Sequence, residues 1–127
     1  MGQLCHCVGD TVNGIPIVCS GTSDVPTSSC SIYSNGNWVK YIQPISNRVY
    51  KASSVSLTNS LFVTGGCTLK SNSANGANLN SDYFVSTTNL VFTNGTIKNG
   101  TNMPERIARH CMAKMYGGQV AAIIGGK

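Results

Sequence analysis

Cys5, His6 and Cys7 stand side by side near the start of the sequence, and all three are residue types that bind metal ions. Structural zinc sites usually separate their cysteines by two or more residues and repeat the pair further along the chain, which does not happen here. On a strand, Cys5 and Cys7 would simply share one face as small apolar residues. The sequence therefore predicts no metal site, and it indicates no cofactor.

Acid–base catalysis needs paired carboxylates, or a carboxylate beside a histidine. His6 falls in a predicted strand, and His110 falls on the flank of a predicted helix. Neither the G-x-S-x-G nucleophile motif nor a phosphate-binding loop occurs. The few carboxylate side chains are spread over some 95 positions: Asp10, Asp24, Asp82 and Glu105. We therefore predict that the protein is not an enzyme.

Basic and aromatic residues alternate around one predicted turn. On a sheet, aromatic rings can stack on unpaired RNA bases while Lys and Arg contact phosphates. Three solvated charges beside core aromatics would give the same pattern, so both interpretations stay open at this point. The residues are Lys40, Arg48 and Lys51, with Trp38, Tyr41 and Tyr50 between them.

The composition limits the class of protein. Charged residues make up 10% of the 127 positions, against about 25% in ordinary soluble domains. Asn, Ser, Thr and Gly supply 53 residues, while 41% of the chain is apolar, which favours a folded β-rich domain over disorder or a helical bundle. Nine Lys and Arg against four acids give a net charge of +5, which makes a polyanion a reasonable partner.

The N-terminus shows no signal-peptide pattern, and the longest apolar run, Val120 to Ile124, is too short to cross a bilayer. We expect a cytosolic protein that does not contact membranes. The six cysteines are even in number, which would predict a disulfide framework in a secreted chain, but disulfides are rare in a cytosol. Their pairing stays open.

Strand signals fill the first three quarters of the chain. Residues 1–20 predict an N-terminal hairpin that turns at Asn13-Gly14, with its second strand at a sheet edge because of Pro16. Asn35-Gly36 predicts another hairpin. Residues 30–93 then form an antiparallel sheet, which includes a long extended stretch at 48–64, a polar loop at 65–80 and a last strand at 83–93.

The period changes after Asn102, which can cap a helix that has Pro104 in its first turn and Glu105 three residues after the cap. An apolar stripe recurs along residues 102–117, and Gly117-Gly118 would end the helix. Residues 118–127 form an apolar tail. The stripe contains Met103, Ile107, Ala108, Cys111, Met112 and Met115.

The predicted fold class is therefore α+β: an N-terminal β-hairpin and an antiparallel meander sheet, with a C-terminal amphipathic helix on one face. One helix covers only part of such a sheet. The remaining apolar surface favours contact with a second copy of the chain, and the tail suggests a further contact between subunits. We therefore expect a homodimer.

Two segments resemble the coat proteins of single-stranded RNA bacteriophages. One is Ile42-Gln43-Pro44-Ile45-Ser46-Asn47-Arg48-Val49-Tyr50-Lys51, which is similar to the turn between two central strands of those proteins. The other, Gly66-Cys67-Thr68 followed by Ala74-Asn75-Gly76, resembles their cysteine-bearing loop. The order of the remaining features agrees over residues 40–116.

The resemblance implies a coat protein of the levivirus type, with the whole chain as one coat-protein domain. Two chains would form an interlocked homodimer. These dimers would assemble into an icosahedral shell in the host bacterial cytoplasm, bind genomic single-stranded RNA inside the virion and repress translation of the replicase. By position, the implied RNA-binding residues are Lys40, Asn47, Arg48, Lys51, Ser53 and Tyr83. The implied assembly loop contains Cys67, Asn75 and Gly76, and the implied dimer helix presents Ile107, Cys111, Met112 and Met115.

Two other classes stay open. A capsid-decoration or tail-fibre β-module of a virion would have the same polar, uncharged surface. A disulfide-stabilised secreted binding domain would require the cysteines to be paired.

Overall fold

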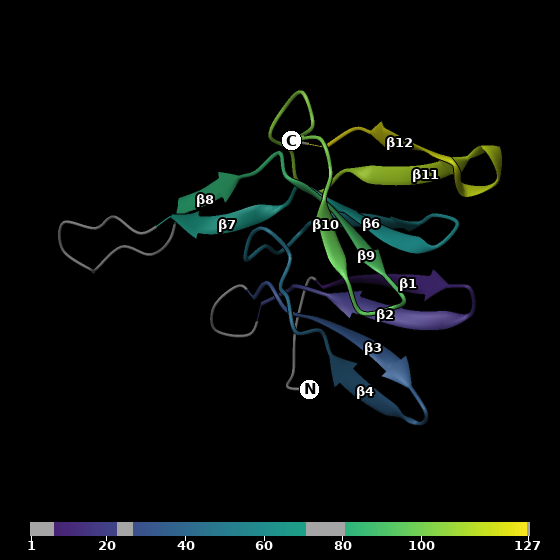
Figure 1. Cartoon of the computed structure of the whole chain (residues 1–127). Helices are drawn as coiled ribbons and strands as arrows, with labels where there is room; N and C mark the ends of the chain where they lie inside the picture. Colours follow the sequence, from purple (N-terminus) through teal and green to yellow (C-terminus); the bar gives the residue numbers. More distant parts are fainter. Residues whose placement is uncertain (1–6, 23–26, 71–80, 127) are drawn as a thin grey trace.

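The computed structural model describes residues 7–22, 27–70 and 81–126, and this part of the chain is built almost wholly of antiparallel strands (Figure 1). None of its helical segments is long and apolar enough to cross a membrane. The first six strands are β1 (Val8–Val12), β2 (Ile15–Cys19), β3 (Cys30–Ser34), β4 (Asn37–Lys40), β5 (Ser53–Ser56) and β6 (Ser60–Thr64). The others are β7 (Cys67–Lys70), β8 (Ser81–Phe84), β9 (Thr88–Phe92), β10 (Ile97–Asn99), β11 (Cys111–Met115) and β12 (Val120–Ile124).

The first sheet runs up and down in the order β1-β2-β3-β4. Its two predicted Asn-Gly turns are confirmed: φ is 51° and 77° at Asn13 and Gly14, and 51° and 83° at Asn35 and Gly36. Two successive positive φ angles fit a tight hairpin turn, and Asn and Gly adopt them most easily. The predicted edge position of the second strand is wrong, because β2 lies between β1 and β3. Pro16 is tolerated there because β3 pairs only with residues 17–19 of β2.

The second sheet repeats this plan in the order β5-β6-β9-β10. The predicted long strand at 48–64 is a hairpin in its second half, where β5 and β6 pair around residues 57–59. The predicted last strand at 83–93 is two strands, because β8 pairs with β7 while β9 joins this sheet. The β7–β8 hairpin lies between the second and third strands of the sheet in sequence and projects from the rest of the molecule (Figure 1).

The predicted helix at residues 102–117 is wrong, and with it the α+β fold class and the dimer helix that the resemblance implied. Residues 111–115 form β11, which pairs with β12, the segment expected to be a free tail. A single 3-10 turn, Tyr116–Gly118, connects the two strands. The chain is therefore all-β over its described part.

Tertiary hydrogen bonds explain the missing helix. The N–H of Met103 donates to the Ser86 carbonyl (2.8 Å), and the N–H of Ile107 donates to the Val85 carbonyl (3.3 Å). Arg109 has a φ of 56°, which an α-helix does not allow. These groups therefore hold the segment against the second sheet, and the apolar periodicity does not decide its structure.

Strands β2, β6 and β12 are each followed by two residues with positive φ. A Cβ atom on Gly66 would lie 3.0 Å from Ala52 Cβ and 3.0 Å from the Tyr50 carbonyl oxygen. A Cβ atom on Gly126 would lie 2.9 Å from His110 Cβ and 3.1 Å from the Ala108 carbonyl oxygen. His110 and Ala108 precede β11 by as many residues as Ala52 and Tyr50 precede β5. The pairs of φ angles are 56° and 106° (Ser20, Gly21), 61° and 105° (Gly65, Gly66), and 72° and 97° (Gly125, Gly126).

The glycines after β2 and β6 also make the same backbone hydrogen bond to a later segment of the chain. The Gly21 N–H donates to the Val49 carbonyl at 2.9 Å, and the Gly66 N–H donates to the Ile107 carbonyl at 2.9 Å. Val49 lies four residues before the start of β5, and Ile107 lies four residues before the start of β11. The structure is therefore an internal repeat: a four-stranded unit that occurs twice, followed by its first two strands a third time. The sequence reading did not find this repeat.

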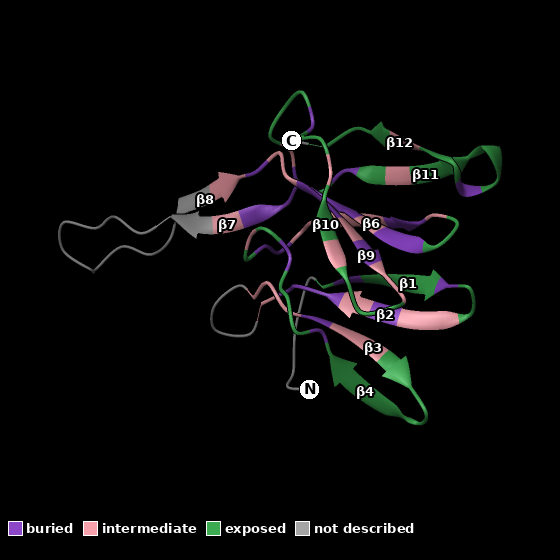
Figure 2. Cartoon of the chain, viewed as in Figure 1, coloured by how far each residue is buried: buried purple, intermediate pink, exposed green. Residues whose placement is uncertain are grey.

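The main hydrophobic core lies between the first two units (Figure 2). Ile17 of β2, Leu61 of β6 and Val91 of β9 are fully buried in it. Tyr41 also belongs to this core and donates its hydroxyl to the Phe92 carbonyl at 2.6 Å. The core therefore fixes the first unit against the second and positions the strands that border the candidate site.

Candidate binding site at the first strands

The first strands of the three units are neighbours. β1 lies against β5, and β5 lies against β11. Because each unit starts in the same way, residues just before these strands come together at one end and residues near the following turns come together at the other. Both ends are hollowed.

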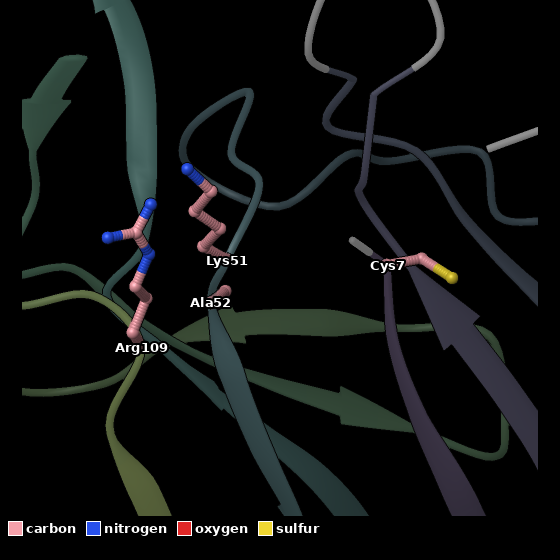
Figure 3. A pocket seen from close by; sticks show the side chains of 4 residues that line it. All are labelled: Cys7, Lys51, Ala52 and Arg109. Atoms are coloured by element: carbon pink, nitrogen blue, oxygen red, sulfur yellow. The ribbon is translucent and has the colours of Figure 1, made fainter. Parts of the chain in front are cut away.

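The hollow at the starts of the first strands has a volume of about 580 Å³ and is lined by Cys7, Lys51, Ala52 and Arg109 (Figure 3). We call it the basic hollow. Cys7 directly precedes β1, Ala52 directly precedes β5, and Arg109 lies two residues before β11. All three units therefore contribute to it.

Lys51 and Arg109 occupy equivalent positions, two residues before β5 and β11. Both have a φ of 56°, a conformation that residues with a side chain rarely adopt. The Arg109 N–H donates to the Lys51 carbonyl at 3.0 Å, which ties the two backbones together. Figure 3 shows both side chains extending to the same side of these segments. The Lys51 Nζ also lies 5.0 Å from the centre of the Tyr50 ring.

The basic hollow has no carboxylate among the described residues that line it. Cys7 has an exposed free thiol, and Figure 3 shows that its sulfur points away from the two cations. Cys7 therefore contributes to the wall, and its thiol is not directed at Lys51 or Arg109. The site consists of two positive side chains above a small, partly apolar floor at Ala52.

The hollow at the other end of the first strands has a volume of about 490 Å³. Asp10 of β1 and Lys114 of β11 stand on its walls, so it carries both signs of charge. The remaining lining residues are Thr11, Asn13, Val55, Ser56, Leu57, Thr58 and Gly117.

His110 follows Arg109 and is buried. Its Nε2 lies 2.6 Å from Thr64 Oγ1, and the Thr64 hydroxyl donates to Met112 Sδ at 3.0 Å. The tautomer of the His110 ring decides which of these two groups donates to the other. The buried Nδ1 has no hydrogen-bond partner among the described residues. Burial lowers the pKa of His110, because the charged ring would lose its contact with water.

The predicted RNA-binding residues lie on different elements. Lys40 is exposed on β4, and Arg48 is exposed in the segment between the two sheets. Only Lys51 reaches the basic hollow. Ser53 is half-buried at the start of β5. The Tyr83 ring on β8 packs under the Arg106 guanidinium, with 4.8 Å between the ring centre and Arg106 Cζ.

Asn47 is used within the protein, since its Oδ1 accepts a hydrogen bond from Thr87 Oγ1 at 2.7 Å. The aromatic residues of the predicted platform are also separated: Tyr41 is buried, whereas Trp38 is exposed and packs edge-on against Tyr33, with ring centres 5.3 Å apart.

The residues predicted for assembly do not form one surface. Cys67 is buried at the start of β7, and Asn75 and Gly76 lie outside the described residues. The predicted dimer stripe is broken up, because Ile107 is half-buried before β11 and the other three alternate along that strand. Cys111 and Met115 are exposed, and Met112 is half-buried.

The described residues hold no group of three His, Cys, Asp or Glu side chains able to bind a metal ion. Cys5 and His6 lie outside the described part. The sequence reading missed Arg109 as a site residue because it assigned Arg109 to a helix flank. The signal that could have found it is the recurrence of an apolar strand followed by Ser-Gly or Gly-Gly, at residues 15–21, 60–66 and 120–126.

No family model and no curated protein matches this chain. Among solved structures 66 chains match, so the arrangement of strands is a common one. One of them is described as the structure of YjhT and is similar with a TM-score of 0.71 at 12% sequence identity. The alignment covers 91% of this chain and 33% of that one. This chain therefore spans about a third of the length of that neighbour, and the similarity shows the fold alone.

Proposed function

We propose that the protein is a binding module of the β-propeller type. The observation that carries this proposal is the repeated unit: two four-stranded antiparallel sheets of the same order and half of a third, joined by equivalent backbone hydrogen bonds. β-Propellers repeat four-stranded sheets around a central channel, and kelch repeats recur about every 50 residues. Gly21, Gly66 and Gly126, which are equivalent, are 45 and 60 positions apart.

The binding surface in this proposal is the set of first strands and their two hollows. Ligand sites in proteins are concave and lie where several elements meet. Here β1, β5 and β11 meet, and each unit contributes residues to both ends. Two cations, the methyl group of Ala52 and Cys7, whose thiol points away from the cations, line the basic hollow, and this set suits binding better than proton transfer.

Chemical-shift mapping by NMR tests the proposal. We expect that the ligands found in a screen of small molecules and short peptides will shift residues 7, 51–52 and 109, or residues 10–13, 55–58 and 114. The outer strands β4 and β10 should remain unaffected. Shifts confined to β4 and β10 across the screen would overturn the proposal.

The coat-protein hypothesis stays a prediction, and so do its RNA, dimer and virion parts. The fold that it required is not observed, and the implied RNA-binding residues Lys40, Ser53 and Tyr83 lie on β4, β5 and β8. Electron microscopy of a bacterial lysate that contains the expressed chain separates the two ideas. Uniform RNA-filled shells would establish the coat protein, whereas small soluble particles are expected for a binding module.

The secreted binding domain also remains a prediction. One feature that it calls for is present, because Cys19 of β2 and Cys30 of β3 form a disulfide. Cys7 and Cys111 are exposed free thiols.

A further inference from the structure

We propose that the basic hollow binds an oxyanion, a carboxylate or phosphate group of a small ligand, held between Lys51 and Arg109. This inference rests on the proposed binding function and adds the chemistry of its ligand. It is carried by the convergence of two cationic side chains from equivalent positions of two units, in a hollow of about 580 Å³. Small-molecule sites commonly have volumes of about 300 to 1,000 Å³.

The backbone brings the two charges together. Arg109 N–H and the Lys51 carbonyl are hydrogen-bonded at 3.0 Å, so the two residues lie side by side although 58 positions separate them. Like charges held close together repel each other. A negatively charged group between them would remove this repulsion, because no carboxylate of the described lining does so.

The conformation of both residues is unusual as well. Each has a φ of 56° although neither is glycine, and such conformations cluster at binding and catalytic sites. The equivalent position of the first unit is His6, which lies outside the described residues. The two side chains extend in the same direction in Figure 3.

The side-chain chemistry selects the ligand class. The planar guanidinium of Arg109 can donate two parallel hydrogen bonds to a carboxylate or phosphate, and the ammonium of Lys51 adds a compact positive charge. Both groups are solvent-accessible, since Arg109 is exposed and Lys51 is half-buried. A long polyanion would need a stripe of cations, and the other predicted basic residues, Lys40 and Arg48, do not line this hollow.

Titration calorimetry and NMR at low ionic strength test the inference, with inorganic phosphate and citrate as separate probes. We expect binding of at least one probe, with chemical-shift changes at Lys51, Ala52 and Arg109. Binding of phosphate alone or of citrate alone tells which group the site prefers. Lys51→Gln and Arg109→Gln should each weaken binding tenfold or more, since a charge-assisted hydrogen bond is lost.

Lys98→Gln is the matched control. Lys98 is exposed on β10, where its Nζ lies 5.8 Å from the centre of the Phe92 ring, and its replacement removes the same charge. Affinity should be unchanged in this variant, and all three variants should melt within a few degrees of the parent. Arg109→Lys, which keeps the charge but loses the fork, should retain part of the affinity.

Two outcomes would overturn the inference: no binding of either probe, whether or not single-stranded RNA binds, or an equal loss of affinity in Lys98→Gln. If other ligands in the screen still map to the second hollow, the binding module stands and only the oxyanion site falls. If nothing maps to the first strands, both proposals fall.

Discussion

At the scale of single residues, the stability of the protein depends on an uncharged His110. Its pKa is lowered by burial from the ordinary value of 6.5. Between that value and the lowered one, the unfolded chain binds more protons than the folded protein. The free energy of unfolding therefore rises with pH in this range. We expect the full contribution above about pH 6.5 and its progressive loss below it.

Thermal melts at pH 5.5 and pH 7.5 measure this effect, and the melting temperature should be lower at pH 5.5. His110→Gln removes the titrating ring, so the difference between the two pH values should shrink in the variant even if it is less stable at both. An unchanged pH difference in His110→Gln would contradict the assignment.

A second prediction at the scale of single residues concerns Gly66, where the chain makes the close contact that recurs at Gly126. A methyl group there would lie 3.0 Å from both Ala52 Cβ and the Tyr50 carbonyl oxygen, and the φ of 105° already disfavours a side chain. Backbone and a short side chain cannot yield easily, so Gly66→Ala should lower the free energy of unfolding by about 3 kcal/mol.

Gly36 provides the control for this substitution, because its φ is 83° but a Cβ there would meet nothing within 4 Å. Gly36→Ala should therefore lose only the backbone preference, about 1–2 kcal/mol in urea unfolding. Equal losses in the two variants would show that the close approach at Gly66 has no energetic weight.

At the scale of elements, the disulfide between Cys19 and Cys30 fixes β2 to β3 within the first unit. The two cysteines are 11 positions apart, so the bond closes a short loop in the unfolded chain. In the chain-entropy model, replacement of both cysteines by alanine should lower the free energy of unfolding by about 3 kcal/mol. Reductant should destabilise the parent to a similar degree and leave the double variant unaffected.

Cys111→Ala serves as the control, because Cys111 is an exposed free thiol. Its unfolding curve should match that of the parent. If reductant leaves the parent's melting temperature unchanged, the disulfide does not stabilise the protein.

Elements whose geometry is set locally could be predicted from the sequence. Asn13-Gly14 and Asn35-Gly36 gave correct hairpin turns because the positive φ angles depend on the two residues themselves. The segment at 102–117 could not be predicted in this way. Its apolar spacing suits a helix, but its N–H groups find partners in distant parts of the chain, such as the Lys51 carbonyl. Lys51 and Arg109 come together through the same contacts between distant parts of the chain, so the sequence pattern did not predict their approach either.

At the scale of the whole molecule, the repeat explains why the surface is uneven. The core lies between the first and second units, and the outward sides of the first and third units have no further unit against them in the described chain. Figure 2 shows β4 as fully exposed and β11 and β12 as largely exposed. The exposed large apolar residues of these units include Tyr33, Trp38 and Val39 of the first and Met115, Val120 and Ile124 of the third.

These two apolar surfaces predict association in solution, since exposed apolar patches are normally covered. We expect sedimentation velocity to show complexes whose share grows with protein concentration. Val39, which is 50% exposed on β4, can be changed to Lys without loss of core packing, so Val39→Lys should shift the equilibrium towards the monomer. Lys114→Gln should not, because it alters charge beside the second hollow and leaves both apolar surfaces intact. A parent protein that remains monomeric at every concentration would show that these surfaces stay exposed to water. The low share of charged residues, 10% of the chain, would then not result from contact between copies.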